Sequence, residues 1–331
     1  MPLLLLNVVI TIKVRRLNIE VQMKLLRHWQ QLQNLPPSVV TIGNFDGVHR
    51  GHQAILQRML AISRSQNLVT VVMLFEPQPQ EFFQGKNAPS RLMHWREKVE
   101  VFRELGIDYV LIARFNDDFR ALTAQNFVDK VITPLNCQHL VIGDDFHFGC
   151  DRSGDVNFLR QAGLSSGFTV ESTSTIAFGD ERVSSTRIRC AIKRGDFALA
   201  EHLLGRPFSI AGHIKHGDKI GRTLDFPTAN ISLKRQVSPL AGIYTVKVWG
   251  LGDKLLFGAA NVGTRPAVNG KENRIEVHLL DFQGDIYGRL IRVQFCHKLR
   301  DETNFPSLEA LKVAIANDVQ QARDYFAALS E

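Results

Sequence analysis

Residues 39–52, VVTIGNFDGVHRGH, decide the fold of the first part of this chain. The β-branched run at 39–42 predicts a buried strand, and the apolar positions within residues 53–63 predict a helix after it. The three glycines therefore fall in a strand-to-helix connection, where glycine permits positive φ and lets backbone N–H groups approach an anion. Such a connection is typical of a site that binds nucleotide phosphates.

His49 and His52 lie three residues apart at the start of that helix, so they share one of its faces. An H-x-x-H pair alone is also consistent with a metal site or with an ordinary surface pair. A catalytic metal site needs a third ligand, and no H-E-x-x-H or cysteine-rich spacing stands nearby to supply one. The glycines favour phosphate over zinc.

The charge of the chain fits an enzyme with anionic substrates. Lys and Arg total 40 against 33 Asp and Glu, a net charge of +7 that is spread thinly along 331 residues. A positive field raises the encounter rate with nucleotides. A nucleic-acid-binding protein is the alternative from another class, but its expected feature, aromatic residues interleaved with Lys and Arg on strands, is absent. We therefore expect no nucleic acid as partner.

The four cysteines are widely spaced and form no C-x-x-C, which indicates neither a zinc cluster nor a disulfide framework and favours the reducing cytoplasm. The apolar start, residues 1–12, could be mistaken for a signal peptide. Its positive charges follow the apolar run, no A-x-A site appears, and the run is too short to span a bilayer. We expect no membrane segment.

Two patterns divide the chain. From residue 39 to about 170, β-rich runs alternate with amphipathic stretches, which predicts βαβ units around a parallel sheet. The loops 43–52 and 143–154 should then share the rim at the carboxyl ends of the strands. The alternating segments are 69–75, 91–105, 109–113, 124–132 and 139–143.

After a helical segment at 185–204, the pattern changes to strands without intervening helices, which predicts an antiparallel β-barrel. Residues 307–329 then predict a helix whose apolar stripe, from Leu308 to Leu329, serves packing. The six strand-like runs are 208–214, 229–233, 242–248, 255–262, 274–280 and 289–295.

Several motifs resemble one known family. Residues 43–52 match the G-x-F-D-G-x-H-x-G-H signature of nucleotidyltransferases, in the version carried by bacterial FAD synthetases. FEPQP at 75–79, GDDFHFG at 143–149 and VSSTRIR at 183–189 follow in the order of that family. Downstream, FPTAN at 226–230 resembles the signature of riboflavin kinases. The chain thus resembles the bacterial bifunctional riboflavin kinase/FAD synthetases from residue 23 to about 329.

The resemblance implies an α/β nucleotidyltransferase domain with a Rossmann-like parallel sheet, then a six-stranded antiparallel riboflavin kinase barrel with a C-terminal helix. It implies an N-terminal extension over 1–22, an FMN adenylyltransferase domain over 23–188, a helical linker over 189–206 and a riboflavin kinase domain over 207–331. The implied substrates are riboflavin, FMN and ATP, with FAD as product, Mg²⁺ as cofactor and no obligate protein partner.

For adenylyl transfer, the resemblance implies that His49 and His52 are catalytic and face the triphosphate of ATP while the phosphate of FMN attacks. The hydroxyl residues of 183–189 at a helix start indicate an anion site, although a plain capped helix has the same pattern. The implied ATP-binding residues are Gly43, Phe45, Asp46, Gly47, His49, Gly51, His52, Asp145, Ser185, Thr186 and Arg189.

For riboflavin phosphorylation, the resemblance implies that Glu276 takes the proton from the 5′-hydroxyl and that Thr228 and Asn230 supply oxygens to Mg²⁺. The alternation along 275–280 by itself favours a Glu276 that faces solvent, and the surrounding family motifs favour the catalytic role. Arg300 and Phe305 are implied to close over the flavin. The implied ATP- and flavin-binding residues of the kinase are Gly212, Gly217, Gly221, Arg222, Pro227, Thr228, Asn230, Arg300 and Phe305.

Two positions depart from the family pattern: Asp225 stands where glycine is usual, and Gln78 where histidine is frequent. Asp225 puts the backbone shape of its loop in question, because aspartate tolerates positive φ less well than glycine. The nearest enzymatic alternative keeps the first fold but adenylylates another substrate, such as a pantetheine phosphate or nicotinamide mononucleotide. The flavokinase-like second half argues against it.

Overall fold

The computed structural model describes residues 23–173, 176–178, 181–216, 226–233, 238–267 and 270–329. Contacts divide the chain into two compact units, which are described separately. Unit 1 contains the described residues up to Ala88 together with Met93–Val183, and unit 2 contains Pro89–Leu92 and the described residues from Ser184 onward. The expected extension, 1–22, lies outside the described residues. None of the described helices is both long and apolar enough to cross a membrane.

Unit 1 is built on a six-stranded parallel sheet in the order β1-β4-β3-β2-β5-β6, which confirms the predicted parallel sheet. Neither edge strand was predicted, because β1 has too few residues to show a periodicity and β6 contains a single apolar residue, Val170. The strands are β1 (Lys24–Leu26), β2 (Ser38–Ile42), β3 (Val69–Glu76), β4 (Tyr109–Arg114), β5 (Cys137–Gly143) and β6 (Thr169–Thr173).

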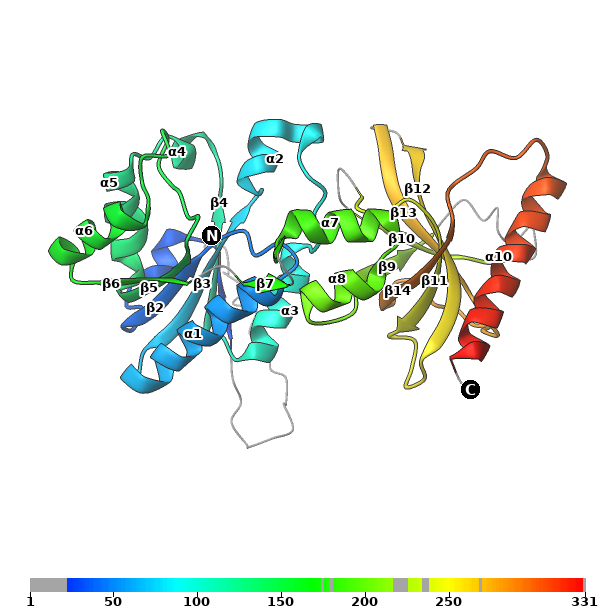
Figure 1. Cartoon of the computed structure of the whole chain (residues 1–331), viewed down its shortest axis with the longest axis horizontal. Helices are drawn as coiled ribbons and strands as arrows, with labels where there is room; N and C mark the ends of the chain where they lie inside the picture. Colours follow the sequence, from blue (N-terminus) through cyan, green and yellow to red (C-terminus); the bar gives the residue numbers. More distant parts are fainter. Residues whose placement is uncertain are drawn as a thin grey trace, which may run out of the picture. The chain divides into compact units, whose positions relative to one another are not determined.

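Helices cover both faces of this sheet (Figure 1). α1 (Arg50–Gln66) and α3 (Trp95–Leu105) pack on the face that carries Val39. α5, η3 and α6 pack on the opposite face, which carries Val40. Burial on both faces explains the continuous apolar runs of the central strands. The remaining helices are α2 (Pro79–Gln84), α4 (Asp117–Arg120), α5 (Ala124–Phe127), α6 (Val156–Ser166), η1 (Trp29–Leu32), η2 (Gly85–Asn87), η3 (Val128–Ile132) and η4 (Thr133–Leu135).

Unit 1 ends in a short hairpin, β7 (Ala177–Phe178) and β8 (Glu181–Arg182), that the sequence analysis missed. The helical segment predicted at 185–204 is two helices, α7 (Ser185–Arg194) and α8 (Phe197–Leu204). They are separated because Gly195 adopts a left-handed conformation, φ 79°, that ends α7. By their contacts both helices belong to unit 2.

Unit 2 contains a closed six-stranded barrel in the order β10-β13-β12-β11-β14-β9, and every pairing is antiparallel, as predicted. Its core is apolar and includes Tyr244, Val277 and Phe295. The strands are β9 (Ser209–Lys215), β10 (Ala229–Ser232), β11 (Gly242–Trp249), β12 (Leu256–Ala267), β13 (Gly270–Leu279) and β14 (Leu290–Arg300).

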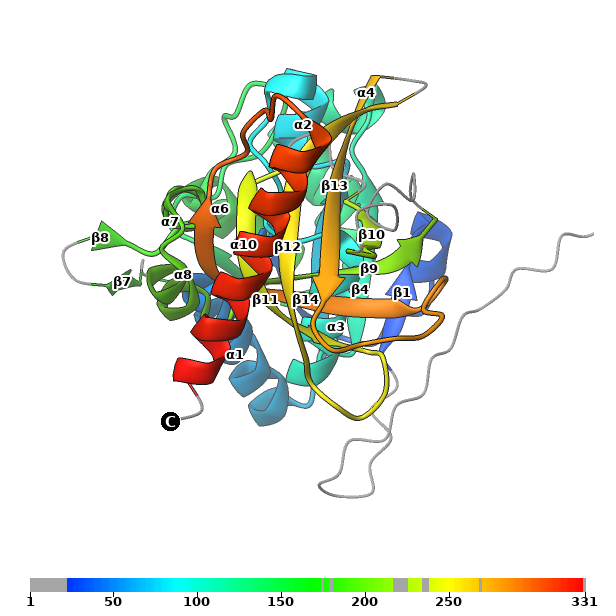
Figure 2. The ribbon, with the colours of Figure 1, turned by 90° about the vertical axis from the view of Figure 1, so that its right-hand side faces the viewer.

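The C-terminal helix α10 (Leu308–Ala328) lies across the barrel strands in Figure 2. The middle of its apolar stripe packs as predicted, with Ala322 fully buried and Phe326 stacked on Phe257. The prediction is wrong at the two ends, since Leu308 is 62% exposed and Leu329 is 61% exposed. Packing on the barrel therefore does not account for every apolar residue of this stripe.

Candidate active sites

The loop between β2 and α1 in unit 1 has an unusual backbone. Phe45, Gly47 and Val48 all have positive φ, at 47°, 83° and 40°. A β-branched residue such as Val48 rarely adopts this conformation, which stores strain of about 1–3 kcal/mol. The side chains of Phe45 and Val48 compensate by packing in the core beneath α1. The buried side chains therefore hold the loop in one conformation, in which the backbone reverses direction just before α1 begins.

The two histidines of the loop lie together. Their rings stack with centroids 3.6 Å apart and planes 16° apart. His49 is the N-cap of α1, and its Nδ1 accepts a hydrogen bond from the backbone N–H of His52 at 3.3 Å. A Cβ at Gly51 would lie 3.2 Å from two atoms of the His49 ring, so glycine leaves room for that ring. In the described residues no three His, Cys, Asp or Glu side chains gather as a metal site.

Two buried charged residues hold the 43–52 loop through hydrogen bonds to the backbone. Asp46, 3% exposed, accepts a hydrogen bond from the backbone N–H of Met93 at 3.1 Å. Lys98, 2% exposed, donates from Nζ to the carbonyl of Asn44 at 2.7 Å. The sequence analysis expected Asp46 to contact ATP and missed Lys98. A lysine on an amphipathic helix gives no sequence sign that it is buried.

The rim of the sheet is arranged as predicted. β2 and β5 are neighbours and parallel, so the loops that follow them lie at the same edge. Asp145, in the loop after β5, is exposed and its carboxylate pairs with Arg182 of β8 at 2.8 Å. The side chain expected to contact the nucleotide therefore also ties its loop to the β7–β8 hairpin.

Residues 184–189 of the VSSTRIR segment form the N-cap and the start of α7, in unit 2. The N-cap is Ser184, whose Oγ accepts from the backbone N–H of Arg187 at 3.2 Å. Arg189 donates from Nε to the carbonyl of Ser90 at 2.6 Å. Ser185 and Thr186 occupy the first turn, where N–H groups face outward and the helix dipole favours an anion.

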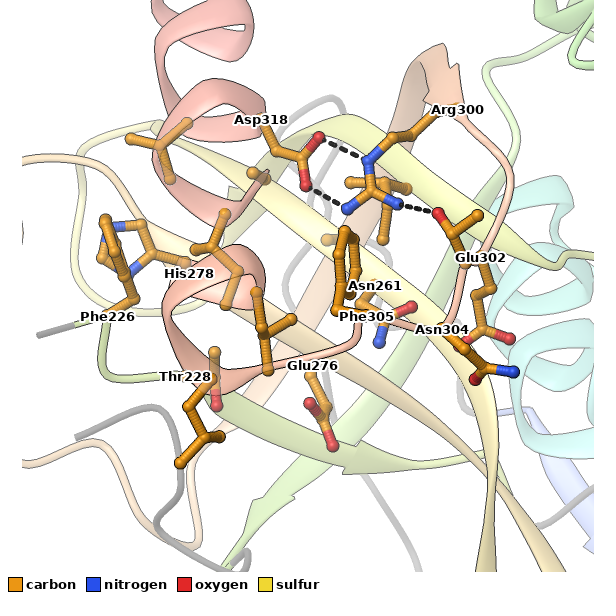
Figure 3. Close-up of a pocket in the computed structure, with 18 of the residues that line it drawn as sticks. Phe226, Thr228, Asn261, Glu276, His278, Arg300, Glu302, Asn304, Phe305 and Asp318 are labelled. Carbon is orange, nitrogen blue, oxygen red and sulfur yellow. Dashed lines mark hydrogen bonds and ion pairs between the residues drawn. The ribbon is translucent and has the colours of Figure 1, made fainter. Parts of the chain in front are cut away.

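Unit 2 contains a cavity of about 830 Å³ between the barrel and α10 (Figure 3). Its lining brings together Thr228, Glu276, Arg300 and Phe305, four of the residues that the sequence analysis singled out. In Figure 3 Thr228 and Glu276 lie at the lower end of the cavity and Arg300 at the upper end. The cavity is large enough for a drug-sized ligand.

Strand register places Glu276 between two asparagines. It is opposite Asn230 of β10 on one side and Asn261 of β12 on the other. Its neighbours Ile275 and Val277 are fully buried, so Glu276 is on the opposite, outer face of the strand. That face lines the cavity, which reconciles the solvent-facing periodicity with a role at a site. Sequence spacing could not have indicated Asn261.

Thr228 and Asn230 lie side by side, with Asn230 Nδ2 3.2 Å from the carbonyl of Thr228. His278 fixes Pro227, the residue before Thr228, because its Nδ1 donates to the carbonyl of Pro227 at 3.0 Å. Burial lowers the pKa of His278 and the hydrogen bond to Pro227 partly offsets this, so the environment favours the neutral ring. His278 lines the cavity and was not assigned a role from sequence.

The apolar wall of the cavity comes from the first half of α10. This arrangement explains why the apolar stripe of α10 is only partly packed, since four residues of the stripe line the cavity. They are Leu308, Leu311, Ile315 and Val319.

Other predicted residues have a structural explanation or fall outside the described ranges. A Cβ at Gly212 would lie 2.4 Å from Cγ2 of Ile231, so that glycine permits close strand packing. Gly217, Gly221, Arg222 and Asp225 lie outside the described residues.

Comparison with known proteins identifies the family. A family model described as FAD synthetase matches residues 31–187, and one described as riboflavin kinase matches residues 204–326. A bifunctional riboflavin kinase/FMN adenylyltransferase of Escherichia coli strain K12 is 51% identical over 307 residues, which cover 92% of this chain and 98% of the relative. The chain belongs to the bifunctional riboflavin kinase/FMN adenylyltransferase family.

A second relative has the same family name, and one solved structure has a similar fold. A riboflavin kinase/FMN adenylyltransferase of Pseudomonas fluorescens is 51% identical over 298 residues, 88% of this chain and 95% of the relative. A crystal structure described as a macrolide-efflux protein from Streptococcus pneumoniae has a TM-score of 0.76 and 30% identity, covering 90% of this chain and 98% of that one. Within the family's two-part organisation, unit 1 carries the H-x-G-H loop and unit 2 the P-T-A-N cavity.

Proposed function

We propose that this chain phosphorylates riboflavin to FMN in the barrel unit and transfers the adenylyl group of ATP to FMN through the 43–52 loop, giving FAD and pyrophosphate. The observation that carries the proposal is the cavity shared by Thr228 and Glu276, a hydroxyl from the residue just before β10 and a carboxylate on β13, at the lower end of an 830 Å³ space. The curated relatives, which are named for both activities, support it.

In the kinase reaction, the 5′-hydroxyl of riboflavin attacks the γ-phosphorus of ATP and ADP leaves. Glu276 accepts the hydroxyl proton as a general base, which its position on the cavity wall allows. The apolar half of α10 and the ring of Phe305 cover the flavin ring, since both line the same space. The barrel therefore supplies the base and α10 the flavin surface.

The oxygens beside Glu276 fit a magnesium ion. Thr228 offers a hydroxyl and Asn230, opposite Glu276 in the barrel, an amide oxygen, and hard cations prefer oxygen ligands. When bound, Mg²⁺ would neutralise charge on the phosphates of ATP. Thr228 and Asn230 would hold it, and His278 would keep Thr228 in place through the Pro227 carbonyl.

In the adenylyl transfer, the phosphate of FMN attacks the α-phosphorus of ATP and pyrophosphate leaves, so no covalent enzyme intermediate is needed. His49 and His52 face the phosphates at the start of α1, where the helix dipole and the loop N–H groups also favour negative charge. Ser185, Thr186 and Arg189, at the start of α7, remain ATP-binding candidates from the sequence motif. The work of the site is alignment and charge stabilisation.

We also propose that the enzyme acts in the cytoplasm. All four of its cysteines are free, which suits a reducing compartment.

The test is to incubate the protein with ATP, Mg²⁺ and riboflavin and to separate FMN from FAD by chromatography. Both products are expected. His49→Ala combined with His52→Ala should stop at FMN, whereas Glu276→Ala should make FAD only when FMN is supplied. Loss of both activities in either variant contradicts separate sites, and formation of neither product by the wild type refutes the proposal.

A further inference from the structure

The cavity of unit 2 contains an ion pair between a buried carboxylate, Asp318, and the partly exposed Arg300, and no sequence motif indicated the carboxylate. Asp318, on α10, is 4% exposed. Its two carboxylate oxygens accept from Nε and Nη2 of Arg300 at 2.8 and 2.7 Å. Both side chains line the cavity, and Figure 3 shows the pair at its upper end. A two-point pair of this kind fixes the orientation of the guanidinium.

The third nitrogen of Arg300 is also directed at protein. Nη1 donates to the carbonyl of Asp301 and to Oγ1 of Thr303, both at 3.1 Å. These four hydrogen bonds occupy all three nitrogens of the guanidinium, which has five N–H groups. Arg300 therefore acts on the cavity chiefly through the segment it holds.

That segment, residues 301–307, joins the end of β14 to the start of α10 and carries Phe305. The guanidinium carbon of Arg300 lies 5.4 Å from the centroid of the Phe305 ring, a cation–π contact. Asp318 lies 18 residues beyond Arg300, so the ion pair closes a loop around the segment. Closing the loop reduces the conformational freedom that binding would otherwise remove.

We infer that Asp318 is a positioning residue for the flavin side of the kinase cavity. Its buried carboxylate holds Arg300, and Arg300 holds Thr303 and Phe305 in the shape that receives the ring system of riboflavin. This inference rests on the proposed kinase function and deepens it, because it assigns to the C-terminal helix a role in flavin affinity. The affinity for ATP, which is proposed to bind at the Thr228 end of the cavity, should depend little on Asp318.

Asp318→Asn tests the inference, because it removes the charge while keeping size and one acceptor. In the full chain, riboflavin affinity, measured by quenching of flavin fluorescence, should weaken about 10- to 100-fold, the range for losing a charge-assisted hydrogen bond. The KM for ATP in riboflavin phosphorylation should change less than about twofold. Conversion of supplied FMN to FAD should remain at the wild-type level, which shows that unit 1 is folded, while the unchanged KM for ATP in riboflavin phosphorylation shows that unit 2 is folded.

A matched control is present on the same helix. Arg323 forms a two-point pair with Asp281, at 2.7 Å for both bonds, but its side chain is 42% exposed and that of Asp281 75%. Arg323→Gln should leave riboflavin affinity unchanged. Arg300→Gln should weaken it more than Asp318→Asn, because the buried Asp318 is then left without its cation. In the double variant the two losses should not add.

The outcomes separate the two proposals. If the wild type phosphorylates riboflavin and Asp318→Asn binds it with wild-type affinity, the positioning role is refuted and the kinase stands. Equal weakening of riboflavin and ATP, in Asp318→Asn or in the Arg323→Gln control, also refutes the role and indicates a general loss of unit 2 structure. If the wild type neither binds nor phosphorylates riboflavin, the proposed function fails and the inference fails with it.

Discussion

The ring of His52 lies flat against the ring of His49, with centroids 3.6 Å apart, while Nδ1 of His49 accepts the backbone N–H of His52. The hydrogen bond leaves Nε2 of His49 as the N–H of the neutral ring. The stack therefore fixes the orientation of one imidazole by means of the other. The pair acts as a unit, and variants of the two positions should not have additive effects.

Replacing His52 distinguishes its ring from its nitrogens. His52→Phe keeps an aromatic ring against His49, whereas His52→Ala removes both ring and nitrogens. Loss of a donor to the transition state lowers kcat about 10²- to 10³-fold. Both variants should show this loss in FAD formation from FMN, with riboflavin phosphorylation unchanged. Near-normal FAD formation by His52→Phe would show that only stacking matters.

Gly51→Ala tests whether the space beside His49 is required. The added Cβ would stand 3.2 Å from Cε1 and Nδ1 of His49, so the ring must shift by a few tenths of an ångström. We expect FAD formation to fall at least about tenfold, since catalysis depends on alignment at this scale. The thermal midpoint should change little. An unchanged rate of FAD formation contradicts the proposed role of the His49 orientation.

Lys98→Met should loosen the 43–52 loop. The variant removes the hydrogen bond from Nζ to Asn44 at 2.7 Å, and a bond from a charged donor contributes about 1.5–3 kcal/mol. Unit 1 should unfold at a lower temperature and FAD formation should decline, while the kinase activity of unit 2 persists. Calorimetry and the two assays measure these effects. Lys130→Met, at an exposed lysine of the same unit, is the control and should change neither.

Tyr244 should make unit 2 sensitive to alkali. Burial raises its pKa to about 12 from an ordinary value of 10. Because the folded pKa lies above the unfolded one, the resulting stability is present below pH 10 and is lost as pH rises from 10 toward 12. Tyr244→Phe should lose about 1 kcal/mol at neutral pH, since its hydroxyl donates to the Ala241 carbonyl. It should then lose less stability than wild type between pH 9 and pH 11, as followed by chemical denaturation at each pH.

Much of the fold was predictable because it is recorded locally. Strand runs bounded by turn residues predicted the four inner strands of the parallel sheet and the six strands of the barrel to within about five residues. The errors have equally local causes. Three-residue β1 is too short for a period, and an apolar stripe cannot distinguish packing from the lining of a cavity.

The amino-acid sequence by itself therefore determined the order of the main elements and the family, and it predicted a phosphate-binding loop at residues 43–52. The tertiary structure alone decided which side chains support those motifs: Lys98 under Asn44, Asn261 beside Glu276, and Asp318 on Arg300. Each pair joins residues 15 or more positions apart, on different elements. Such contacts depend on strand register and helix docking, which the spacing of residues along one segment does not encode.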